Sequence, residues 1–186
     1  MRGRGGCEGR DKGARGELMF FTRKTAVAEI YTKMRQQAFE LRFPASNNAL
    51  VHVVLMDWKL ERGTTTVVAA ADGSASMYLS NGGGYVGGGQ KDPWIHEFAL
   101  NAVDLAGGLL KEFKKAKYFD LPNGRDVFFY ATTAEGVFRG IAPIAELKDG
   151  SHRFSDLGNE MQKIINGYRR ISVKAPENGP KQESIQ

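Results

Sequence analysis

The chain has 186 residues, of which 41% are hydrophobic and 25% are charged, and these proportions are typical of a globular protein with one core. Its formal net charge of +5 permits an acidic partner, but five basic and three acidic residues fall within residues 1–18. The remaining excess is spread thinly, so the charge pattern disfavours nucleic acid as a partner.

Both ends of the chain are polar and lack the apolar residues needed for a core. We therefore expect disordered tails at residues 1–18 and 173–186, around a single domain at residues 19–172. The one cysteine, Cys7, lies in the first tail, which leaves no disulfide or cysteine metal site in the domain. No apolar run approaches the ~20 residues of a membrane helix, so we expect a cytoplasmic protein without membrane insertion.

The first two expected elements are a helix over residues 25–41 and a strand over residues 50–58. The helix carries an apolar stripe of Val27, Ile30, Tyr31, Met34, Ala38 and Leu41. The strand is apolar on both faces of its pleat, which predicts a central position covered from both sides. Asp57, near its end, is interpreted as a residue that starts a turn or caps an element.

The next segment predicts a β-hairpin with a two-residue turn at Asp72-Gly73. That turn places Val68 opposite Met77 on one face and Val67 opposite Tyr78 on the other. The second face is small and uncharged, which indicates cover by a helix, a second subunit or a ligand.

A glycine-rich loop then leads into a helix over residues 92–117, with Asp92 as N-cap. The mid-helix pair Gly107-Gly108 predicts close approach of another backbone. A final apolar stripe predicts a helix over residues 154–170, formed by Leu157, Met161, Ile164, Ile165 and Tyr168.

A second hairpin is expected around Glu135-Gly136, with Arg139 opposite Thr132 on the face that carries Tyr130. The complete order is α-β-β-β-α-β-β-α. We therefore expect an α+β domain with a five-stranded, mainly antiparallel sheet and three helices.

The loop contains the spacing of a dinucleotide site in Gly82, Gly84 and Gly87, but a hairpin precedes it where a βαβ unit would be needed. The acidic N-cap after the loop also stands where an anion would bind. Three scattered histidines lack metal-ligand spacing, and no nucleophile or catalytic triad can be recognised, so no metal or cofactor is expected. Arg139, in a strand with aromatic neighbours, could hold a carboxylate or phosphate.

The segment MDWKLERGTTTVVAAADGSASMYLSNGGGYVGGG resembles an uncharacterised family of bacterial proteins, and the likeness extends over residues 19–170. The resemblance to that family implies no known activity. The order of elements is also similar to profilin and roadblock-type modules, a resemblance that implies binding, scaffolding or dimerisation.

The sequence thus favours a non-enzymatic binding or assembly module that self-associates or binds another protein through a sheet face and the glycine loop. The candidate contact residues are Tyr78, Gly82, Gly83, Gly84, Tyr85, Gly87, His96 and Arg139. The alternative is an enzyme that binds a small ligand or nucleotide with the Gly82–Gly89 loop and the following helix N-terminus, assisted by Arg139 or His96.

Overall fold

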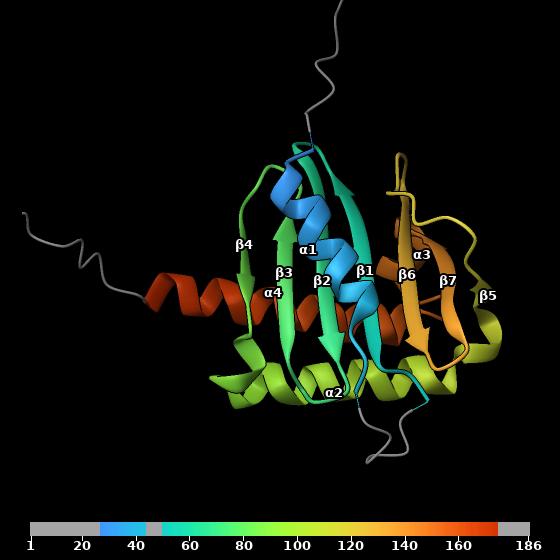
Figure 1. The fold of residues 1–186 in the computed structure, drawn as a ribbon. Helices are drawn as coiled ribbons and strands as arrows, with labels where there is room; N and C mark the ends of the chain where they lie inside the picture. The colour runs from blue at the N-terminus through green and yellow to red at the C-terminus, as the bar shows by residue number, and fades with distance from the viewer. Residues whose placement is uncertain (1–26, 44–49, 175–186) are drawn as a thin grey trace, which may run out of the picture.

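A seven-stranded antiparallel sheet forms the centre of the protein, whose computed structural model describes residues 27–43 and 50–174. The strands lie in the order β4-β3-β2-β1-β6-β7-β5 (Figure 1). They are β1 (Val53–Leu60), β2 (Gly63–Ala70), β3 (Ala75–Leu79), β4 (Gly84–Val86), β5 (Lys114–Lys115), β6 (Asp126–Thr133) and β7 (Gly136–Pro143). The α-helices are α1 (Glu29–Glu40), α2 (Pro93–Gly108), α3 (Ile144–Asp149) and α4 (Ser155–Lys174).

The α+β class is confirmed, while the described residues hold seven strands and four α-helices where five and three were expected. Strands β4 and β5 and helix α3 are the additional elements, and two 3₁₀ turns, η2 (Gly88–Gln90) and η3 (Leu110–Glu112), flank α2. The predicted tails lie outside the described residues, except that residues 173 and 174 belong to α4.

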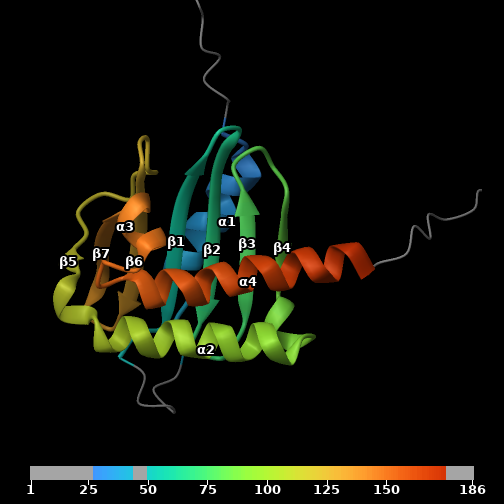
Figure 2. The ribbon, with the colours of Figure 1, turned by 180° about the vertical axis from the view of Figure 1, so that it is seen from behind.

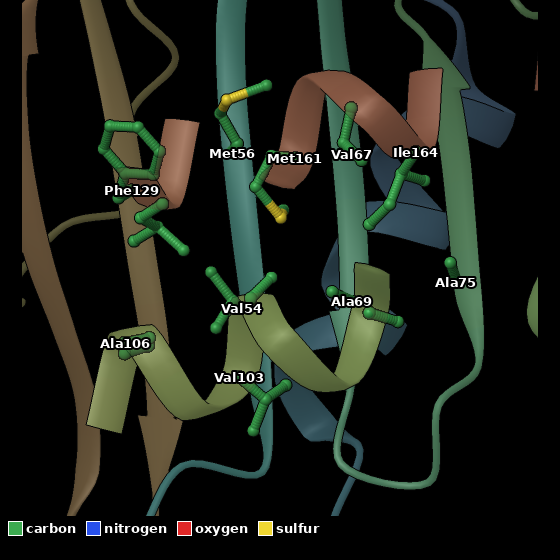
Figure 3. Close-up of a cluster of buried hydrophobic side chains, with 14 of the residues drawn as sticks. Val54, Met56, Val67, Ala69, Ala75, Val103, Ala106, Phe129, Met161 and Ile164 are labelled. Carbon is green, nitrogen blue, oxygen red and sulfur yellow. The ribbon is translucent and has the colours of Figure 1, made fainter. Parts of the chain in front are cut away.

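Strand β1 is central, as predicted, with β2 on one side and β6 on the other. Its first five residues are buried, because helices cover both faces of the sheet. Helix α1 lies on one face (Figure 1), and the antiparallel pair α2 and α4 crosses the other (Figure 2). On that second face, Val54 and Val67 from the strands pack with Val103 of α2 and Ile164 of α4 (Figure 3).

Helix α1 buries only part of the expected stripe, namely Tyr31 and Ala38, with Met34 partly buried beside them. Its buried residues are Tyr31, Arg35 and Ala38, whereas Val27, Ile30 and Leu41 are 48%, 55% and 42% exposed. The apolar pattern predicted the helix but only part of its buried side, because Arg35 also lies on that side and meets an acidic partner in the sheet.

The first hairpin pairs in a register one residue away from the prediction. Its loop holds three residues, since the Ala70 N–H donates to the Ser74 carbonyl and Gly73 adopts a φ of 76°. Met77 therefore lies opposite Val67, and Tyr78 lies opposite Thr66. The slip exchanges the two faces of β3, so each face differs in composition from the prediction, but both remain uncharged and helices cover both.

Helix α2 begins as predicted, because the Asp92 carboxylate accepts hydrogen bonds from Trp94 N at 2.9 Å and Ile95 N at 3.3 Å. It ends at Gly108, nine residues before the expected end, and the chain continues through η3 into β5. The prediction of a close backbone at Gly107-Gly108 is wrong: a Cβ atom at either position would meet nothing within 4 Å. These glycines lie where the helix stops.

The second hairpin has a two-residue loop at Ala134-Glu135, so Arg139 lies opposite Tyr130 and not opposite Thr132. A shift of two residues keeps every side chain on its expected face, and Arg139 still shares a face with Tyr130. Helix α4 buries all five apolar residues of the predicted stripe.

Candidate functional site

The glycine segment, residues 82–89, forms the edge of the sheet and does not extend as an open loop. It contains β4, which pairs with β3, and it leads into η2. A Cβ atom at Gly84 would lie 2.4 Å from the Met77 carbonyl oxygen, and one at Gly89 would lie 2.0 Å from the Gly73 carbonyl oxygen. The glycines therefore serve close packing of backbone on backbone.

Two tyrosines hold this segment against α4. The ring of Tyr85 stacks on Tyr168 with centroids 5.1 Å apart, and its hydroxyl bonds to that of Ser172. The Tyr168 hydroxyl donates to the Ala75 carbonyl at 2.6 Å and accepts from Gly88 N at 3.1 Å. Burial raises the pKa of Tyr168 to about 12, so the phenol stays protonated and able to donate.

Most of the predicted site residues gather at this side of the sheet. Gly82, Gly83, Gly84 and Tyr85 are exposed, and Gly87 is half-buried. His96 is exposed in the first turns of α2, and a Cβ atom at Gly73 would lie 2.2 Å from its ring, so it packs over the hairpin turn.

Two predicted residues lie elsewhere. Tyr78 is only 8% exposed, in the core between the sheet and α1, and it is therefore not available as a surface anchor. Arg139 lies on β7, towards the opposite edge of the sheet. Of the surface that was expected to make contacts, the sheet face at Tyr78 is covered by α1, and the edge strand β4 is exposed.

An anion at the α2 N-terminus would compete with the protein's own carboxylate. Asp92 already accepts from two of the N–H groups in the first turn. The geometry therefore gives no support to a phosphate at this helix end.

The two edges of the sheet differ in chemistry. Edge strand β5 consists of Lys114 and Lys115, whereas β4 carries Tyr85 and Val86, which are 38% and 68% exposed. No charged residue occurs in the sequence between Asp72 and Lys91. Lysines on an edge strand discourage pairing with another chain, and β4 has no such protection.

A second group of polar residues surrounds Arg139. A hollow of about 320 Å³ is lined by Lys114, Lys115, Arg139, His152 and Arg153, and we call it the basic hollow. The Lys114 backbone lies directly opposite Arg139 across the β5–β7 pair. Sequence reasoning singled out Arg139 but missed its neighbours, because it placed Lys114 and Lys115 on a helix.

A buried ion pair between Arg35 of α1 and Asp57 of β1 was not predicted from the sequence. Arg35 Nε lies 3.1 Å and Nη2 2.5 Å from Asp57 Oδ2, and Arg35 Nη1 donates to the Phe119 carbonyl at 2.8 Å. The Thr66 hydroxyl donates to Asp57 and also bonds to the Tyr31 hydroxyl. Asp57 is thus not the turn or cap residue that was expected.

Burial raises the pKa of the Asp57 carboxyl, while Arg35 and the Thr66 hydroxyl oppose this shift by binding the ionised form. Burial also raises the pKa of Tyr31 to about 12. The network borders a groove of about 580 Å³ between α1 and residues 119–121. Both carboxylate oxygens of Asp57 already accept hydrogen bonds within the protein. We therefore interpret the network as structural, holding α1 on the sheet.

Comparison with protein-family models, with curated proteins and with solved structures gives no match to this chain. The resemblance to a bacterial family therefore stays a prediction. Within residues 27–43 and 50–174, no helix is long and apolar enough to cross a membrane. The same residues contain no group of three His, Cys, Asp or Glu side chains that could hold a metal ion.

Proposed function

We propose that this chain is a non-enzymatic assembly module that forms a homodimer by pairing β4 of one copy with β4 of another. The observation that carries the proposal is the contrast between the two sheet edges: two lysines on β5, and an uncharged strand with an exposed valine on β4. An edge strand keeps a row of backbone N–H and C=O groups without partners, and a second strand satisfies them.

Symmetry makes the absence of charge at β4 significant. In a two-fold dimer the same strand pairs with itself, so each side chain meets its own kind or a near neighbour. A charged residue on β4 would face an identical charge, whereas Tyr85 and Val86 bring apolar surface together. The chain carries a net charge of +5, and an uncharged edge lets two copies approach with the least repulsion.

Helix α4 offers additional contact area beside β4. Its C-terminal end extends past β4, the last strand of the sheet (Figures 1 and 2). Ile171, in the last turns of α4, is 37% exposed. In the proposed dimer each α4 end would reach over the partner's sheet edge and help the interface approach the ~1,200 Å² of a stable contact. The stack of Tyr85 on Tyr168 fixes β4 in place, which lowers the entropy cost of pairing.

The test is the molar mass in solution, measured by light scattering during size-exclusion chromatography over a range of concentrations. We expect the wild-type chain to elute as a dimer. Val86→Lys should weaken the dimer by about tenfold or more, because it places two identical charges across the pairing axis. Val86 is 68% exposed, so the substitution leaves the monomer fold intact.

Leu60→Lys provides a matched control, because Leu60 is also a strand residue, 41% exposed, but lies on the central strand β1. It adds the same charge and should leave the dimer unchanged. A wild-type protein that is monomeric at every concentration, or a dimer that both variants affect equally, would contradict the proposal.

A further inference from the structure

A pocket of about 350 Å³ lies between α3 and α4, over the central strands β1 and β6 and away from the edge strand β4. Figure 2 shows α4 between α3 and α2, and the pocket is on the α3 side. We infer that this α3–α4 pocket binds a small aromatic carboxylic acid. The inference does not depend on the oligomeric state of the protein.

The floor of the pocket comes from the sheet and is apolar. Met56 and Trp58 lie two residues apart on β1, so their side chains share one face of the sheet, the face that α2 and α4 cover. Val127 of β6 lies directly across from Trp58 on the same face. Met56 and Val127 are each 3% exposed, whereas Trp58 is half-buried. An aromatic ring of a ligand can therefore stack on the accessible part of Trp58.

The walls come from one face of each helix, so the lining side chains converge on the same space. The lining residues of α3 follow the i, i+3, i+4 spacing of a single helix face, and they are Ile144, Leu147 and Lys148. Those of α4 follow the same rule, and they are Ser155, Gly158, Asn159 and Gln162. This face of α4 points away from α2, because α2 approaches Gly167, on the opposite side of the helix from Gly158.

Gly158 keeps the pocket open. A Cβ atom there would lie 3.6 Å from Leu147 Cδ2 and 3.7 Å from Phe129 Cζ, which are ordinary contact distances. Close packing therefore does not require a glycine at this position. Glycine inside a helix is less favourable than alanine, because its backbone loses more freedom on folding. The helix thus holds its least favourable residue apart from proline where a larger side chain would fill the pocket.

The charge of the pocket suits an anion. Its lining contains one charged side chain, Lys148, and no aspartate or glutamate. None of the ion pairs among residues 27–43 and 50–174 involves Lys148, so its ammonium group is free to bind a carboxylate. Lys148 and Asn159 are exposed, which places them at the mouth of the pocket, and the amides of Asn159 and Gln162 add N–H donors. A ligand would thus place its ring on the apolar floor and its carboxylate at the mouth.

Size and charge together favour a monocarboxylic acid with one ring system. The volume of about 350 Å³ is near the lower end of the range for small-molecule sites. A phosphate group carries up to two charges, and a single lysine beside apolar walls does not replace the water that such a group loses on binding. A carboxylate carries one charge, which one lysine and two amides can satisfy.

The test compares three probes that share one body: phenylpropanoate, its neutral amide, and the cation phenylpropylamine. Isothermal titration with the full chain measures affinity, and Trp58 fluorescence reports on the pocket in a Trp94→Phe background, because the chain has two tryptophans. We expect the carboxylate to bind most tightly, the amine most weakly, and binding to change the Trp58 emission. Lys148→Gln should weaken carboxylate binding by about fivefold, the effect of one partly exposed ion pair, and leave amide binding unchanged.

Gly158→Leu should abolish binding, because the new side chain occupies the pocket. Gly108→Leu is the matched control, since Gly108 does not line the pocket and a Cβ atom there would meet nothing within 4 Å. Lys148 is exposed, so its variant folds normally even if Gly158→Leu does not. The inference is overturned if no probe binds at millimolar concentration, or if the amine binds as tightly as the carboxylate. It is also overturned if binding leaves the Trp58 emission unchanged, or if the two leucine variants weaken binding equally.

Discussion

At the scale of single residues, the network around Asp57 decides how α1 sits on the sheet. Asp57 is 0% exposed, and Arg35 and Thr66 both bind its carboxylate. An ionised carboxylate in a protein core is tolerated only where a partner and hydrogen bonds replace water. The sequence contained one signal for this: an acidic residue inside a strand expected to be covered on both faces needs a partner. It could not identify Arg35, because the rotation of α1 about its axis depends on tertiary packing.

Loss of one member of the buried Arg35–Asp57 pair should lower the free energy of unfolding. Asp57→Asn keeps the shape of the side chain but leaves Arg35 charged in the core, so we expect the free energy of unfolding to fall by about 3–5 kcal/mol in urea titrations. Glu29→Gln is the control, because it breaks the exposed Glu29–Lys33 pair and should change stability little. Replacing both members, with Arg35→Met and Asp57→Leu, should recover part of the loss. Equal stability of Asp57→Asn and the wild-type protein would show that the pair contributes nothing.

The buried tyrosines predict a dependence of stability on alkaline pH. Burial raises the pKa of both Tyr31 and Tyr168 to about 12, above the ordinary value of about 10. Between these two values the unfolded chain loses its phenol protons while the folded chain keeps them, so the free energy of unfolding falls as pH rises. Each tyrosine contributes up to ~2 kcal/mol across this window.

Urea titrations at pH values from about 8 to 11 test this expectation against Tyr31→Phe. That variant is less stable at pH 8, because Thr66 loses a hydrogen-bond partner. Its stability should nevertheless decline less steeply above pH 10 than that of the wild-type chain. Identical slopes for the two proteins would mean that Tyr31 titrates normally in the folded state.

At the scale of elements, the sequence correctly predicted the features that depend on local interactions. The N-cap at Asp92 follows from hydrogen bonds within one turn, and the α4 stripe follows from helical spacing. The register of the first hairpin depends on whether Ala71 belongs to the strand or to the loop, which the Asp72-Gly73 pair alone does not settle. Strands β4 and β5 are too short to show the alternation of buried and exposed residues that marks a strand in a sequence. They form strands only because β3 and β7 lie beside them.

The different roles of two glycines can be tested by substitution with alanine. Gly89→Ala would place a Cβ atom 2.0 Å from the Gly73 carbonyl oxygen, so we expect a loss of about 1–3 kcal/mol in the free energy of unfolding. Gly107→Ala meets no atom within 4 Å and should be neutral or stabilise α2 by about 0.5–1 kcal/mol. Thermal unfolding of both variants measures the difference. Similar effects at the two positions would contradict the close packing assigned to the glycine segment.

At the scale of the whole molecule, both faces of the sheet are covered by helices, which leaves its two edges to pair with another chain. The sequence predicted a module that binds through a sheet face, but α1 covers the face at Tyr78. We therefore propose that the chain assembles through the edge strand β4.

Amide hydrogen exchange at residues 84–86 tests the proposed pairing of β4 most directly. In a β4–β4 dimer, the outward N–H groups of this strand are bonded to the partner and exchange slowly at high protein concentration. We expect this protection to decrease on dilution and in Val86→Lys, while exchange in the central strand β1 stays unchanged. Exchange at residues 84–86 that is the same at high and low concentration, and in both proteins, would contradict the account.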